Sequence, residues 1–225
     1  AVMAKGETMI ESAACEPEVQ DLGNFLNAMG AKVEGHGTPC IRVTGVKELH
    51  GATYEIGPDR IEAGSYVLMA AATRCDITIR NVKPSQLLVL IDKLEEHGMK
   101  FRCDDDSISI HCPRSPKPVS VTTYPYPGFP TDLQAQFIAA MALTPGVSLI
   151  TDKVFPDRFI HIAELNRMGA NVRREGNTAI IEGTRQLFGA PVMASDLRAS
   201  AALVIAGLAA QGTTEIHRVY HLDRG

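Results

Sequence analysis

A short motif occurs three times along this chain, and it limits strongly the folds that the sequence can adopt. Residues 26–33, 94–101 and 165–172 each read as the last turn of a helix, then a glycine, then the start of a strand. Glycine is the residue that most readily takes the left-handed conformation that ends many helices. Because the three glycines recur at intervals of roughly 70 residues, the repeating unit is a supersecondary structure and not a short solenoid repeat.

Each copy is surrounded by the same succession of elements. An amphipathic helix precedes the glycine, and we expect these helices over residues 18–29, 86–97 and 160–168. A hairpin follows, because residues 107–111 and 179–183 alternate between apolar and polar side chains, as half-buried strands do. A second helix and a further strand then complete the unit.

The second helix of each unit is apolar on nearly all sides. These apolar stretches cover residues 66–72, 137–143 and 199–210. The strands that we expect after them cover residues 75–79, 147–151 and 213–217. A helix without a polar face is stable only when it is buried. The sequence therefore predicts an α/β unit, repeated about three times around shared central helices.

Each apolar helix begins beside an aspartate, namely Asp59, Asp132 or Asp196. Aspartate at a helix start commonly accepts hydrogen bonds from the free backbone N–H groups there. For Asp132, which follows Pro130 and Thr131, two interpretations stay open. Spacing alone favours a helix cap. The alternative is a general base, because the helix dipole favours the ionised carboxylate, which is ready to accept a proton.

Three arginines near helix ends are candidate ligands for an anion. Arg158 lies at a strand-to-helix junction, and Arg198 lies in the first turn of its helix, where a cation opposes the dipole. Arg198 therefore needs either a ligand anion or a salt bridge to Asp196, and Arg224 beside Asp223 has the same ambiguity. Together the arginines could clamp a carboxylate or a phosphate in bidentate fashion.

Composition excludes several classes of protein. A net charge of -4 argues against a nucleic-acid-binding or anionic-membrane surface. No signal peptide or apolar run of membrane-spanning length is present, so we expect a cytoplasmic location. The five cysteines lack paired CxxC spacing, and we expect reduced thiols that mostly serve as small core residues. The seven histidines show no metal-ligand spacing, so we expect no bound metal.

Two features bear on the organisation of the chain. It begins without methionine and stops at residue 225 without a closing element, so we expect a segment of a longer protein, truncated at both ends. Residues 47–58 contain two glycines and no clear periodicity, which is typical of a hinge between two bodies.

With these motifs in place, the chain resembles the enolpyruvyl transferases, and within them the branch that acts on UDP-N-acetylglucosamine. The matching segments run from end to end and cover residues 16–18, 25–31, 58–64, 129–136, 158–159, 164–170, 196–199 and 221–225. The resemblance implies a two-domain inside-out α/β barrel. Residues 1–57 would then finish the first domain and residues 58–225 would form most of the second, with the substrate cleft between them.

The resemblance also implies a reaction. The enolpyruvyl group of phosphoenolpyruvate would pass to the 3-hydroxyl of UDP-N-acetylglucosamine with release of phosphate, which opens peptidoglycan synthesis. Asp132 would be the catalytic base, and no cofactor or metal would take part. The resemblance implies substrate-binding or supporting roles for Thr131, Val154, Phe155, Arg158, Arg198, Arg224, Arg60 and Asp196. It does not indicate an oligomeric state.

Two other functions stay open. The first is the sister enzyme that transfers enolpyruvate to shikimate 3-phosphate, although residues 129–136 and 221–225 favour the nucleotide-sugar branch. The second is a non-catalytic nucleotide-sugar-binding paralogue. The resemblance places a reactive loop cysteine upstream of Ala1, and none of the five cysteines occupies that position. We therefore expect the 225-residue segment to be inactive alone.

Overall fold

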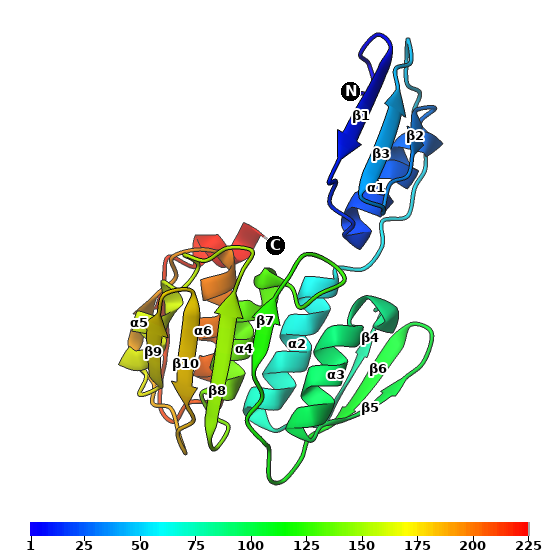
Figure 1. Ribbon diagram of the computed structural model, residues 1–225. Coiled ribbons are helices and arrows are strands. Elements are labelled where there is room, and N and C mark those ends of the chain that lie inside the picture. The colour runs from blue at the N-terminus through cyan, green and yellow to red at the C-terminus, as the bar shows by residue number, and fades with distance from the viewer. Residues whose placement is uncertain (225) are drawn as a thin grey trace. The chain divides into compact units, whose positions relative to one another are not determined.

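The computed structural model describes residues 1–224, without the side chain of Arg224, and this part of the chain divides into two compact units (Figure 1). Unit 1 comprises Ala1–Pro58 together with Pro125–Pro127. Unit 2 comprises Asp59–Tyr124 and the described residues from Gly128 onward. Each unit has its own hydrophobic core.

Unit 1 is a small antiparallel sheet with a helix against it (Figure 1). Its elements are β1 (Glu7–Glu11), α1 (Pro17–Ala28), β2 (Lys32–Glu34) and β3 (Cys40–Thr44). The strand order is β1-β3-β2, so β3 is paired on both edges. Its core is small and consists of Ala31, Val33, Ile41 and Val43.

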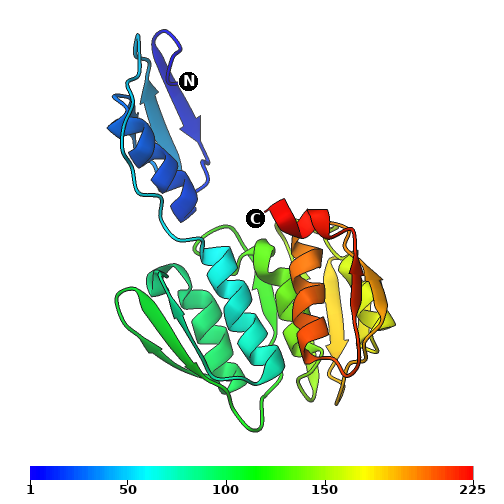
Figure 2. The ribbon, with the colours of Figure 1, turned by 180° about the vertical axis from the view of Figure 1, so that it is seen from behind.

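The centre of unit 2 is formed by the apolar helices α2 (Arg60–Thr73), α4 (Gln134–Met141) and α6 (Leu197–Ala209). Each of them packs against the other two, and Figure 2 shows them side by side. Every residue of α4 is buried. The prediction of three buried apolar helices is therefore confirmed.

The sheets and the amphipathic helices of unit 2 surround this centre. One sheet is antiparallel with the order β4-β6-β5. A second is mixed with the order β7-β8-β10-β9, in which only β7 and β8 are parallel, and β11 pairs with β12 in parallel. The strands are β4 (Ile77–Arg80), β5 (Lys100–Cys103), β6 (Ser107–His111), β7 (Val121–Thr123), β8 (Val147–Asp152), β9 (Asn171–Glu175), β10 (Thr178–Glu182), β11 (Pro191–Met193) and β12 (Glu215–His217). The remaining helices are α3 (Leu88–His97), α5 (His161–Arg167) and the short 3₁₀ helices η1 (Pro84–Gln86), η2 (Thr131–Leu133) and η3 (Val219–Arg224). Helices inside and sheets outside make the inside-out α/β fold.

The repeated motif has the backbone conformation that the sequence predicts. Gly30, Gly98 and Gly169 have φ angles of 94°, 105° and 92°, which side chains other than glycine rarely adopt. Each glycine follows one of the amphipathic helices α1, α3 and α5 directly or after one residue. The three copies therefore end their helices in the same way.

An asparagine strengthens two of the three copies. The amide of Asn27 bonds both the N–H and the C=O of Val33, at 2.8 Å each. Asn166 makes the same pair of bonds to Val172, at 3.0 and 2.8 Å. These bonds join the end of each helix to the strand after it.

The expectation that most cysteines are core residues is wrong. Cys40, Cys75 and Cys103 are exposed, Cys15 is half-buried, and Cys112 is buried. Burial raises the pKa of the Cys112 thiol to about 11. All five are free thiols.

Across residues 1–224, no helix combines the length and the apolar character that crossing a lipid bilayer requires.

Gly64 marks the closest approach inside the central helix group. A Cβ atom at this position of α2 would lie 2.5 Å from Cδ1 of Leu133 and 3.3 Å from Cδ2 of Leu90. Real Cβ atoms do not approach other heavy atoms as closely as 2.5 Å. Gly64 therefore lets α2 and the start of α4 pack tightly.

We predict that Gly64→Ala lowers the free energy of unfolding by about 1–3 kcal/mol, because the added methyl group overpacks the core. Gly207→Ala is the matched control in α6, since its Cβ would meet Thr214 at 3.3 Å or more. Both changes bring the same gain in helix propensity, so their difference isolates the overpacking. Urea denaturation measures both variants, and equal stabilities would contradict the prediction.

Candidate active site

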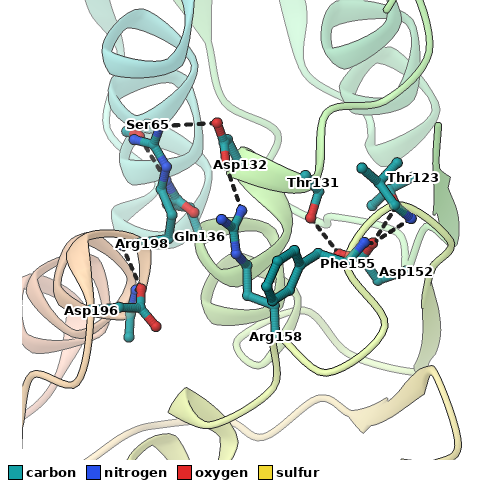
Figure 3. Close-up of polar contacts among 12 residues, drawn as sticks. Ser65, Thr123, Thr131, Asp132, Gln136, Asp152, Phe155, Arg158, Asp196 and Arg198 are labelled. Atoms are coloured by element: carbon teal, nitrogen blue, oxygen red, sulfur yellow. Dashed lines mark hydrogen bonds and ion pairs between the residues drawn. The ribbon is translucent and has the colours of Figure 1, made fainter. Parts of the chain in front are cut away.

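The three central helices of unit 2 run parallel, so that their N-terminal parts meet. Gln136 of α4 donates a hydrogen bond to the hydroxyl of Ser65 of α2 at 3.0 Å, and Arg198 of α6 reaches Asp132, just ahead of α4 (Figure 3). At the opposite end, the last turns of α2 and α6 and Leu143 line one cavity of about 510 Å³. The positive ends of three helix dipoles therefore gather at one place, which favours bound anions there.

Two of the three aspartates cap their helices as predicted. Asp59 accepts hydrogen bonds from the N–H groups of Ile61 and Glu62, at 2.7 and 3.1 Å. Asp196 accepts two such bonds at the start of α6, at 2.8 and 2.9 Å. Both carboxylates satisfy N–H groups that a helix leaves unpaired at its start.

Asp132 does something else, and the interpretation of this residue as a helix cap is wrong. It lies in η2, and neither η2 nor α4 has a side-chain cap hydrogen bond. Instead, its Oδ1 accepts a hydrogen bond from Nη1 of Arg158 at 2.5 Å, and its Oδ2 accepts one from Nη2 of Arg198 at 3.0 Å (Figure 3). A salt bridge from Arg198 to Asp196 was one of the two alternatives for this arginine, and Arg198 pairs with Asp132 instead.

The environment of Asp132 favours the carboxylate form. Partial burial by itself would raise the pKa of Asp132, but hydrogen bonds and charges from Arg198 and Arg158 outweigh it and hold the pKa below its usual range. The side chains of Arg158 and Arg198 are 24% and 23% exposed. Each guanidinium has further N–H donors beyond the one that faces Asp132. The site therefore offers one carboxylate and two partly sheltered cations.

Arg158 is held by the turn between β8 and α5. The buried carboxylate of Asp152 accepts hydrogen bonds from the N–H groups of Val154 and Phe155, at 3.0 and 2.7 Å. The guanidinium of Arg158 lies over the ring of Phe155, 4.9 Å from its centroid. Val154 and Phe155 are 41% and 53% exposed, so this turn presents both residues to solvent.

Thr131 joins the same network. Its hydroxyl donates a hydrogen bond to Oδ2 of Asp152 at 2.6 Å (Figure 3). Asp152 was not among the predicted site residues, because the strand was expected to end at Thr151. The available signal was an aspartate directly after an apolar strand and two residues before Val154, the spacing at which Asp59 and Asp196 bond the backbone.

The remaining predicted residues have different positions. Arg60 is buried in the first turn of α2, with 8% exposure. The backbone of Arg224 belongs to η3, but its side chain lies outside the described part of the chain, so its role stays a prediction. Asp196 uses its carboxylate to cap α6. The structure thus brings Asp132, Arg158 and Arg198 together directly.

His161 is a buried neighbour of the site and was not among the predicted site residues. It begins α5 with 1% exposure, and its Nε2 has no hydrogen-bond partner among the described residues. Burial, assisted by the charge of Arg158 and opposed by that of Asp196, lowers the pKa of His161 to about 4. This histidine is therefore neutral at neutral pH.

Within residues 1–224, no group of three or more His, Cys, Asp or Glu side chains is arranged to hold a metal ion.

We predict that His161 makes stability depend on pH. In the unfolded chain it gains a proton near pH 6.5, whereas the folded chain resists protonation down to about pH 4. Its contribution is therefore complete above pH 6.5 and is lost as the pH falls towards 4, by at most about 3 kcal/mol.

Urea denaturation between pH 7 and pH 5 tests this contribution of His161. His161→Gln should make the free energy of unfolding decline less steeply as the pH falls. Some decline should remain, because His97, another buried histidine with a pKa lowered by burial, contributes a smaller part of it. A combined His161→Gln and His97→Gln variant should be flatter still. If His161→Gln declines as steeply as the wild-type protein, the prediction is wrong.

Comparison with known proteins agrees with the fold and the site. Residues 1–225 match the family described as EPSP synthase (3-phosphoshikimate 1-carboxyvinyltransferase), and the chain belongs to this family of enolpyruvyl transferases. Among solved structures, the enolpyruvyl transferase NikO from Streptomyces tendae superimposes with a TM-score of 0.86 at 25% identity and covers 100% of this chain and 54% of its own. An EPSP synthase from Acinetobacter baumannii gives 0.68 at 22% identity, with 98% and 54% covered, and shares the fold.

Curated relatives at higher identity point to one branch. UDP-N-acetylglucosamine 1-carboxyvinyltransferase from Geobacter metallireducens is 52% identical over 225 residues, which are 100% of this chain and 54% of the relative. The protein of that name from Shewanella woodyi is 54% identical over 226 residues, with 100% and 54% covered. The chain therefore spans about half the length of the curated relatives it matches.

Proposed function

We propose that the protein containing this chain transfers the enolpyruvyl group of phosphoenolpyruvate to the 3-hydroxyl of UDP-N-acetylglucosamine and releases phosphate. The observation that carries the proposal is the carboxylate of Asp132 held between Arg158 and Arg198 at the N-terminal ends of parallel helices. Relatives at 52% and 54% identity carry the corresponding name and support it. The reaction would open peptidoglycan synthesis, and we place it in the cytoplasm.

The reaction sets two tasks that these residues fit. In the addition step, the 3-oxygen of the sugar bonds to C2 of phosphoenolpyruvate, its proton passes to a base, and C3 gains a proton. In the elimination step, C3 loses a proton and the bond from C2 to the phosphate oxygen breaks. Asp132 would accept the hydroxyl proton, and Arg158 and Arg198 would bind the carboxylate and phosphate of the donor.

The ion pairs also suggest how the base is controlled. Both arginines lower the pKa of Asp132, which makes it a weak proton acceptor. When the anionic groups of phosphoenolpyruvate take up guanidinium donors, the stabilisation of the carboxylate weakens. The pKa of Asp132 then rises towards the range in which a carboxylate is an effective base. Asp132 would thus become basic when the donor substrate is in place.

A second candidate is transfer of the same group to shikimate 3-phosphate. The description of the matching family favours it, because it names that enzyme. The fold and the donor chemistry are shared, so the two candidates differ only in the acceptor. A nucleotide-sugar-binding protein without catalysis is the third possibility to be tested.

We predict that the full-length protein releases phosphate from phosphoenolpyruvate with UDP-N-acetylglucosamine and not with shikimate 3-phosphate. A phosphate-release assay with each acceptor separately measures this. Release only with the shikimate compound would reassign the substrate. Release with neither acceptor, combined with binding of the nucleotide sugar in calorimetry, would identify a binding protein.

We predict that Asp132→Asn in the full-length protein lowers turnover by roughly 10²–10⁴, because the amide cannot accept the proton. Binding of UDP-N-acetylglucosamine should stay within a few-fold. Asp157→Asn is the control, since Asp157 is 89% exposed and pairs with Arg174 at 3.0 Å instead of with the site. Steady-state kinetics measures the turnover, and calorimetry measures the binding of UDP-N-acetylglucosamine. Near-normal turnover of Asp132→Asn would exclude the base role.

A further inference from the structure

We propose that Asp152 is a positioning residue, which sets the geometry between the carboxylate of Asp132 and the guanidinium of Arg158. The inference rests on the proposed function, because it concerns the same site. It starts from the burial of Asp152, whose exposure is 0%, and from hydrogen bonds that its two oxygens accept from three separate segments of the chain.

Oδ1 of Asp152 organises the turn that carries Arg158. It accepts hydrogen bonds from the N–H groups of Val154 and Phe155, and a third from the hydroxyl of Thr123 at 2.7 Å. A carboxylate can only accept, so Thr123 donates its hydroxyl hydrogen in the third bond. The Oγ1 atom of Thr123 in turn accepts a hydrogen bond from the N–H of Lys153 at 3.1 Å.

Oδ2 of Asp152 reaches the segment that carries the base. It accepts the hydroxyl hydrogen of Thr131 at 2.6 Å, and Thr131 is the neighbour of Asp132 in η2. Because its hydrogen is engaged, the Thr131 hydroxyl can act towards a substrate only as an acceptor. The first task of this hydroxyl in the structure is thus to tie η2 to Asp152.

These contacts close a ring through the site. Asp152 bonds Thr131, Thr131 adjoins Asp132, and Asp132 pairs with Arg158. Arg158 lies over the ring of Phe155, whose N–H returns to Asp152 (Figure 3). A break anywhere in a closed ring lets the carboxylate and the guanidinium move apart, and misplacement by about 1 Å is enough to lower a catalytic rate by about 10²-fold.

The ring is tested with Thr131→Val, which keeps the shape of the side chain and removes only the bond to Oδ2. In the full-length enzyme, kcat should fall by about 10-fold to 100-fold, with KM for both substrates changed by less than about threefold. The acidic limb of the kcat/KM–pH profile, which reports the free enzyme, should move to higher pH, since Arg158 would hold the Asp132 carboxylate less tightly. Thr131→Ser restores the hydroxyl and should keep kcat within about threefold of the wild-type value.

Thr178→Val is the matched control. It also removes a hydrogen bond of a threonine hydroxyl, here the 2.8 Å bond between Thr178 of β10 and Thr151 of β8. This bond does not involve Asp152. Its kcat and pH profile should equal those of the wild type. Asp152→Ala should lower kcat at least as much as Thr131→Val, and combining the two should cause no further loss. Thr131→Val and Thr131→Ser suffice if Asp152→Ala does not fold.

The outcomes separate this inference from the proposed function. If wild-type enzyme shows no phosphate release with either acceptor, the proposed function fails. If wild type is active but Thr131→Val behaves like Thr178→Val, the positioning role is wrong. A rise in KM for UDP-N-acetylglucosamine at unchanged kcat would also overturn it, because Thr131 would then be a substrate contact. Additive losses in the Asp152→Ala and Thr131→Val pair would do the same.

Discussion

Burial of three apolar helices side by side is the constraint on which unit 2 depends. Because α2, α4 and α6 have no polar face, they must surround one another, and the sheets must cover them from outside. Their parallel direction brings three helix starts together. A buried helix start leaves N–H groups without partners, and the aspartates of α2 and α6 supply those partners. The functional end of the unit follows from this packing requirement.

One sequence pattern nevertheless produces two different structures. Asp59 and Asp196 cap their helices, whereas Asp132 turns its carboxylate to two arginines. The physical difference lies in the turn of 3₁₀ helix, Thr131–Leu133, that precedes α4. The side chain of Asp132 is thereby free to pair with residues from other parts of the chain. The departure from a local rule occurs at the place where the candidate chemistry is found, as is common at functional sites.

The repeat, the buried helices and two of the helix caps could be predicted from the sequence, because each depends on neighbours within a few residues. The hairpin strand over residues 107–111 even agrees with β6 at both ends. The pairs of Asp132 could not be predicted in this way, since Arg158 and Arg198 lie 26 and 66 residues away. Asp152 was missed for a related reason. Its backbone bonds are local, but its bond to Thr131 spans 21 residues and depends on how β8 meets η2.

The pairing of Arg158 and Arg198 with Asp132 affects how strongly the site can bind an anion. Two guanidinium groups less than a quarter exposed would repel each other and remain poorly solvated without a counterion. Asp132 serves as that counterion inside the protein, so that the site need not recruit one from the buffer. A ligand anion must displace this internal partner, and its net binding energy is the difference between two sets of ion pairs. Small anions with a single charge gain little from such an exchange, whereas a ligand that presents both a carboxylate and a phosphate can engage both arginines together.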